Sequence, residues 1–150
     1  MKKLFITLSL AIISLGLSAQ ASANASQIKW TVVAKKTGAN TAEVYFKATL
    51  APTWHIWSQD AGDDMLIPPT FTFKDKDVVP NGKAREIGKK ISKAEEGFKN
   101  KLNYYEGTVV FVQKVKFGKQ KSITGSINYQ ICDPKRCLPP TDFEFNAAVK

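Results

Sequence analysis

The sequence predicts an all-β fold, an immunoglobulin-like antiparallel β-sandwich. Apolar and polar residues alternate with a period of two along most of the chain, which is typical of strands buried on one face. Seven or eight short stretches of this kind follow one another, separated by turn residues, and no stretch has a strong helical pattern. This many short strands within residues 24–150 favours two antiparallel sheets packed face to face.

The first half of the chain contains most of the clear strands. They cover residues 28–37, 41–51, 53–58 and 70–73, with a further strand near 83–88. One face of the second strand consists of Val44, Phe46, Ala48 and Leu50. The turn at 38–40 and the polar, glycine- and proline-containing stretch 59–69 are expected to connect these strands.

The second half begins with the least regular segment, residues 89–107. It favours a long exposed loop, with room for one short helix, and long loops on compact domains tend to be functional or disordered. Strands are then predicted at 108–117, 122–132 and 141–149. Their inward faces would consist of Ile123, Ile127, Tyr129 and Ile131, and of Phe143, Phe145, Ala147 and Val149.

The amino-terminal residues resemble an export signal. Two lysines precede the apolar run Leu4–Leu17, whose 14 residues are too few for a spanning helix, which needs about 20. Small residues follow, and we expect cleavage after Ala23, with Ala21 as the alternative. This predicts a signal peptide at 1–23 and a single domain of 150 − 23 = 127 residues at 24–150, which in a double-membraned bacterium is soluble in the periplasm.

The chain is basic. Without Lys2 and Lys3 it keeps 22 − 2 = 20 basic residues against 13 acidic ones, a net charge of +7. An exported protein rarely meets nucleic acid, and no nucleic-acid module is visible, so no nucleic-acid partner is expected. We interpret the charge mainly as solvated surface, with an acidic protein partner as the alternative. No later segment is apolar enough to enter a membrane, and we expect a monomer.

The only two cysteines are Cys132 and Cys137. Outside the cytoplasm two nearby thiols oxidise unless something reduces them, so we expect a disulfide. Such a bond closes a ring of six residues. A ring of that size stabilises a fold by roughly 2 kcal/mol, against more than 4 kcal/mol for a loop of about 100 residues, so the bond would be a poor structural staple.

The sequence gives little support for a metal site or for a hydrolase active site. A structural zinc site needs a second pair of ligands beside the two cysteines, and none is present. His55 is the only histidine, and no motif marks a nucleophile or an oxyanion hole. We therefore expect neither a metal nor an organic cofactor.

A redox function has support within the loop itself. Lys135 and Arg136 directly precede Cys137, and nearby cations stabilise the reactive thiolate. Asp133 acts in the opposite sense on Cys132, so Cys137 is the sulfur expected to react first. The prolines around the pair stiffen its backbone. From the residues alone, a redox-active pair and a permanent disulfide both remain open.

Residues 129–141, YQICDPKRCLPPT, resemble the active-site loop of the amino-terminal periplasmic domain of DsbD-type thiol:disulfide interchange proteins. Residues 53–73 resemble the strand and loop that precede this site in the family. Residues 103–117 resemble the stretch in which an aromatic cap segment ends in glycine and enters a strand. The resemblance covers nearly the whole mature chain.

The resemblance implies an immunoglobulin-like domain whose cysteine pair relays electrons. A thioredoxin-like donor reduces the pair, which then reduces periplasmic disulfide proteins. A partner thiolate would attack Cys137, and Cys132 would leave and later resolve the mixed disulfide. Lys135 and Arg136 would stabilise the thiolates. The activity would be thiol:disulfide interchange of the protein-disulfide reductase type.

The resemblance also implies neighbours of the cysteine pair. The aromatic cap that covers the disulfide until a partner docks falls on Tyr104 or Tyr105, and Tyr105 is preferred because it stands two residues before Gly107. Core packing is the alternative for both. The aromatic positions ahead of the loop include His55 and Trp57. His55 would assist proton movement beside a thiolate, or else be a packed or surface histidine.

Two features depart from the family pattern. The spacer between the cysteines has four residues, shorter than in the best-known members. The family's transmembrane reductase and thioredoxin-like domain are not part of this sequence, so we expect the electron donor to be a separate protein. The alternative function is a non-catalytic exported binding module with a structural disulfide.

Overall fold

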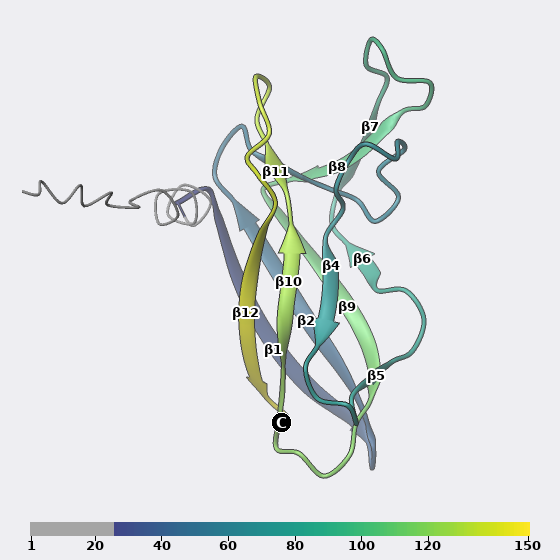
Figure 1. Ribbon diagram of the computed structural model, residues 1–150, viewed down its shortest axis with the longest axis vertical. Helices are drawn as coiled ribbons and strands as arrows, with labels where there is room; N and C mark the ends of the chain where they lie inside the picture. Colours follow the sequence, from purple (N-terminus) through teal and green to yellow (C-terminus); the bar gives the residue numbers. More distant parts are fainter. Residues whose placement is uncertain (1–25) are drawn as a thin grey trace, which may run out of the picture.

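The computed structural model describes residues 26–150. The predicted signal peptide, residues 1–23, lies outside the described residues. Three antiparallel sheets make up the described domain (Figure 1). The first contains β1 (Ile28–Gly38), β2 (Thr41–Leu50), β9 (Thr108–Lys116), β5 (Val79–Pro80) and β6 (Arg85–Ile87). The second contains β12 (Thr141–Ala148), β10 (Ser122–Tyr129) and β4 (Thr70–Phe73). The third contains β11 (Ile131–Cys132), β3 (His55–Trp57), β8 (Leu102–Glu106) and β7 (Lys90–Lys93).

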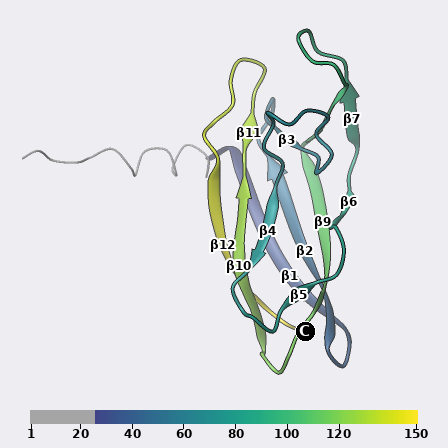
Figure 2. The same cartoon turned by 45° about the vertical axis from the view of Figure 1, so that its right-hand side comes forward.

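The core lies between the first two sheets. Figure 2 shows β12, β10 and β4 along one face of the sheet that contains β1, β2 and β9. Phe46 of β2 stacks on Phe71 of β4 with ring centroids 4.3 Å apart, and Phe145 of β12 meets Phe46 edge-on at 5.2 Å. The alternation predicted for β2 is confirmed, because Val44, Phe46, Ala48 and Leu50 are all buried. The fold is an all-β, immunoglobulin-like antiparallel sandwich, as the sequence predicts.

The third sheet continues the sandwich at one end. β10 and β11 are separated only by Gln130, so the strand that crosses the sandwich leads directly into the small sheet that carries Cys132. The cysteine hairpin (residues 131–138), loop 58–69 and loop 94–101 all lie at this end, at the top of Figure 1. The fold therefore presents the cysteines beside two long connections.

The expectation for residues 89–107 is wrong. This segment contains β7 and β8, which pair from Lys90 opposite Tyr105 to Lys93 opposite Leu102, and only 94–101 is a loop. Strands of four and five residues are too short to show a clear period, and they form here because β8 pairs with β3. The expected number of strands was also too low, since short strands such as β5 bring the described total to twelve.

Within the described residues, we find no helix with the length and apolar character needed to cross a membrane.

Candidate functional site

Cys132 and Cys137 face each other across the hairpin and form a disulfide. Two backbone hydrogen bonds flank the pair, from Asp133 N–H to Arg136 O at 2.8 Å and from Leu138 N–H to Ile131 O at 2.9 Å. This is the pattern around a non-hydrogen-bonded pair of an antiparallel ladder, where opposite side chains lie closest. The disulfide thus joins neighbouring positions of one hairpin and does not tie two sheets together.

Asp133 shapes the tip of the hairpin. Its Oδ1 accepts hydrogen bonds from the backbone N–H of Lys135 at 2.7 Å and of Arg136 at 2.9 Å. This is the local turn geometry that aspartate favours. The hydrogen bond from Lys135, together with that from Arg136 and the two cationic side chains, lowers the pKa of Asp133 although partial desolvation acts against it. The side chains of Lys135 and Arg136 point into solvent at an exposed tip.

The two cysteines differ sharply in exposure. Cys132 is only 2% exposed, whereas Cys137 is exposed. Cys132 belongs to a buried cluster, the Cys132 cluster, that also contains Trp57, Ala61 and Leu102. An incoming thiolate can therefore reach the sulfur of Cys137 much more easily than that of Cys132.

Sheet register places His55 directly opposite Cys132. Opposite residues share a face, so the two side chains lie on the same side of the third sheet. The imidazole packs against the rings of Trp57 at 4.9 Å and Tyr104 at 4.7 Å. Burial lowers the pKa of His55, and the negative charges of Glu106 and Asp133 only partly oppose this. The ring is therefore predominantly neutral at pH 7.

The structure corrects the preference for Tyr105 as the cap. Tyr104 pairs with Trp57 and packs against the Cys132 cluster, but Tyr105 is the next residue of β8 and points to the opposite face. Tyr105 is 2% exposed, packs edge-on against Phe111 and donates its hydroxyl to Glu86 Oε2 at 2.9 Å. Burial, followed by the hydrogen bond to Glu86, raises its pKa. Tyr105 is a core residue.

Sequence reasoning missed two further residues that pack against the Cys132 cluster. Phe98, from loop 94–101, and Leu66, from loop 58–69, pack against the Cys132 cluster. The available signal was a lone aromatic residue within the polar stretch EEGFKN. An aromatic residue in such a stretch is conspicuous, but its contact depends on how the loop folds back over the third sheet.

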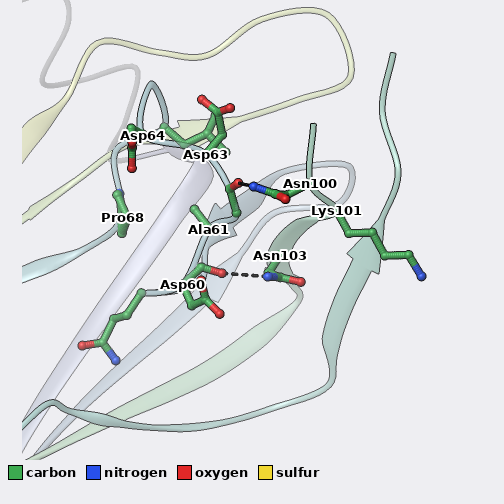
Figure 3. A pocket seen from close by; sticks show the side chains of 11 residues that line it. Asp60, Ala61, Asp63, Asp64, Pro68, Asn100, Lys101 and Asn103 are labelled. Carbon is green, nitrogen blue, oxygen red and sulfur yellow. Dashed lines mark hydrogen bonds between the residues drawn. The ribbon is translucent and has the colours of Figure 1, made fainter. Parts of the chain in front are cut away.

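Side-chain amides of β8 and of loop 94–101 donate hydrogen bonds to backbone carbonyls of loop 58–69 (Figure 3). Asn103 Nδ2 donates to Asp60 O at 2.8 Å, and Asn100 Nδ2 donates to Gly62 O at 3.0 Å. Gly62 has φ +97°, and a Cβ there would lie 2.2 Å from Lys101 O. The loops border an open, polar pocket of about 600 Å³, which the cysteines do not line.

The described residues offer no evident metal site. No three His, Cys, Asp or Glu side chains between residues 26 and 150 are grouped so that they could hold an ion.

Fold and site together define a class of protein, a β-sandwich domain with a disulfide-bonded cysteine pair in a hairpin at one end. The sequence model of the family "Thiol:disulfide interchange protein DsbD, N-terminal" matches residues 18–148. The chain belongs to this family of DsbD amino-terminal domains. No curated protein matches the chain by sequence.

The solved structures that resemble the chain include two related domains. The N-terminal periplasmic domain of ScsB from Proteus mirabilis has a TM-score of 0.60 and 17% identity, over 80% of this chain. This chain covers 45% of that domain, less than half of its length. The DsbD N-terminal domain of Neisseria meningitidis in the reduced form has a TM-score of 0.45 and 17% identity, over 83% of this chain and 86% of that one. At this identity, the ScsB domain supports the fold alone.

Proposed function

We propose that this domain relays reducing equivalents in the periplasm, as a monomer, from a thioredoxin-fold donor to periplasmic disulfide proteins. The observation that carries the proposal is the unequal exposure of the bonded cysteines, with Cys137 accessible and Cys132 2% exposed. A purely structural disulfide needs no accessible sulfur. An exchange reaction needs one sulfur that a partner can attack and a second that can leave and return.

In the reduction half-reaction, a donor thiolate attacks Cys137 Sγ. The S–S bond breaks, and Cys132 leaves as a thiolate that takes up a proton. The second thiolate of the donor then attacks the donor sulfur of the mixed disulfide and releases Cys137 as a thiolate. The donor dithiol has become a disulfide, and the domain has gained two electrons.

In the oxidation half-reaction, the Cys137 thiolate attacks the acceptor disulfide and expels one acceptor thiolate. Cys132, deprotonated, then attacks Cys137 Sγ, re-forms the disulfide and releases the acceptor as a dithiol. Lys135 and Arg136, exposed beside Cys137, favour its thiolate. His55, neutral and opposite Cys132, is positioned to accept the thiol proton of that residue.

Tyr104 and Phe98 form the cap in this proposal. Both pack against the Cys132 cluster, and Phe98 belongs to a loop that a docking partner could displace. Trp57 is a buried member of the cluster against which they pack. The cap shields Cys132 from small thiols while Cys137 stays accessible.

A pair of single variants tests the relay. In Cys132→Ser the remaining thiol is exposed and has no resolving partner, so it should accumulate mixed disulfides with thioredoxin-fold proteins of a periplasmic extract, identified by mass. Cys137→Ser, whose remaining thiol is buried, should trap much less. Equal trapping by both variants, or none by either, would contradict the proposed order of attack.

The reduction potential provides an independent test. Equilibration in graded thiol/disulfide buffers should give a value well above roughly −300 mV, since structural disulfides lie below that range. A lower value would favour the non-catalytic binding module.

A further inference from the structure

The outer face of the first sheet, which faces away from the core, is unusually apolar for a solvated surface. Val33 is exposed and pairs with the half-buried Tyr45 across β1 and β2, and the next residue of this row, Val112 of β9, is buried on the same face. The next row contains Val110 opposite Ile87 of β6. Of the four large apolar side chains exposed between residues 26 and 150, three lie here: Val33 (49%), Val79 (54%) and Ile87 (44%).

The same face is strongly basic. Its exposed cations are Lys29, Lys35, Lys47, Arg85, Lys114 and Lys116. None of them takes part in an ion pair within the described part of the chain. The one carboxylate in these paired rows is Glu43, whose Oε2 accepts the Tyr45 hydroxyl at 2.6 Å. The acidic residues of loop 58–69, by contrast, lie at the cysteine end of the domain.

We propose that the outer face is a peripheral docking surface for an anionic phospholipid bilayer. Five of the six cations are lysines, which protein–protein interfaces disfavour but which anionic headgroups attract as point charges without a demand for geometry. The exposed apolar residues Val33, Val79 and Ile87 are short and spread over a broad sheet, and this suits a lipid interface better than a partner that needs a pocket for an aromatic anchor.

This orientation is compatible with disulfide exchange. The outer face runs along the long axis of the sandwich, whereas the cysteine hairpin lies at one end of that axis (Figure 1). Docking by the face leaves Cys137 open to a partner. Exchange would then take place close to the membrane surface, where membrane-bound partners are concentrated.

Vesicle flotation tests the proposal with the folded, disulfide-bonded domain. We expect binding to vesicles of equal parts phosphatidylglycerol and phosphatidylcholine, no binding to phosphatidylcholine alone, and release by added salt. The variant Lys35→Gln/Lys47→Gln/Lys114→Gln should reduce binding by roughly tenfold or more.

The matched control is Lys76→Gln/Lys119→Gln/Lys121→Gln, which removes the same charge from exposed loop positions outside this face and should bind as the wild type does. An equal loss of vesicle binding in both triple variants would show that only the net charge matters, and it would overturn the proposal. So would binding to polyglutamate but not to anionic vesicles, which would indicate an acidic protein partner. Reduction of the disulfide by dithiothreitol, measured in parallel, should be unchanged in both variants, so a failure of docking is distinct from a failure of exchange.

Discussion

The two sulfurs of the disulfide are bonded to each other, but their surroundings differ strongly. Cys137 is exposed beside two cations, which favour its thiolate. Cys132 is enclosed by Trp57 and Leu102, and apolar burial disfavours its charged form. In the proposed exchange, accessibility directs the attack to Cys137, so Cys132 is the sulfur that leaves even though its burial disfavours the thiolate.

At the residue scale, His55 makes the free energy of unfolding depend on pH. Burial lowers its folded-state pKa below the unfolded value of about 6.5, so the unfolded chain binds a proton more readily than the folded one. The contribution of His55 to stability is thus full above pH 7 and falls as the pH drops through about 6.5 toward the folded pKa, by less than about 1.4 kcal/mol per pH unit.

Urea unfolding at pH 7.5, 6.5 and 5.5 measures this effect. His55→Gln should show a nearly flat profile, because His55 is the only histidine and the carboxylates with shifted values titrate below this window. If the free energy of unfolding depended on pH as steeply in His55→Gln as in the wild type, another group would be responsible.

At the scale of elements, β3 and β8 determine which side chains meet the disulfide. Tyr104 and Tyr105 are adjacent, and only the pairing of β8 with β3 puts Tyr104 on the face of Cys132. A shift of one residue would exchange them, since side chains alternate along a strand. The contacts of Tyr105 on the core side therefore help to maintain the site on the other.

Glu86 connects the first sheet to the third. Its carboxylate accepts hydrogen bonds from Ser58 Oγ at 2.8 Å, Gln59 N–H at 2.6 Å and Tyr105 OH at 2.9 Å, and pairs with Lys90 Nζ at 3.1 Å. Burial alone would raise the pKa of Glu86, but these donors together lower it. The carboxylate is thus held in its charged form by residues of β7, β8 and the end of β3.

Glu86→Ala should destabilise the domain by about 2–4 kcal/mol, because it leaves the Ser58 and Tyr105 hydroxyls without their acceptor. Tyr105→Phe removes one hydrogen bond with little change in shape and should cost about 1 kcal/mol. Chemical denaturation at pH 7 measures both. Equal small losses would show that Glu86 contributes only as a surface charge.

Gly62 controls how the two loops meet. Gly62→Ala would place a Cβ 2.2 Å from Lys101 O and would strain a φ of +97°. We expect loops 58–69 and 94–101 to separate, which would increase the alkylation rate of Cys132 in the reduced protein roughly several-fold. Gly82→Ala is the matched control, because its φ is +72° but no atom lies within 4 Å of the added Cβ. An unchanged alkylation rate in Gly62→Ala would show that the loops do not limit access to Cys132.

At the scale of the whole molecule, the alternation of apolar and polar residues predicts the first two sheets well but not the third. Val44, Phe46 and Ala48 repeat with a period of two over a ten-residue strand, which specifies both the strand and its buried face. β7 and β8 are too short for such a pattern and depend on their tertiary partner. For the site, sequence similarity indicates the cysteine loop, but Phe98 and the choice of Tyr104 depend on loop folding and register.

The placement of the disulfide predicts that the fold does not depend on it. The sulfurs are five residues apart in sequence and close a six-residue ring within one hairpin, which contributes roughly 2 kcal/mol in the chain-entropy model. The aromatic core between the first and second sheets is independent of this bond. Reduction should therefore lower Tm by about 5–10 °C for a domain of this size, with a cooperative transition retained. Thermal unfolding followed by near-ultraviolet circular dichroism, with and without dithiothreitol, measures this, and Cys132→Ala/Cys137→Ala in oxidising buffer controls for the reductant. If the reduced protein lost its near-ultraviolet signal at 25 °C, the bond would be a structural staple. A domain that cycles between disulfide and dithiol must remain folded in both states.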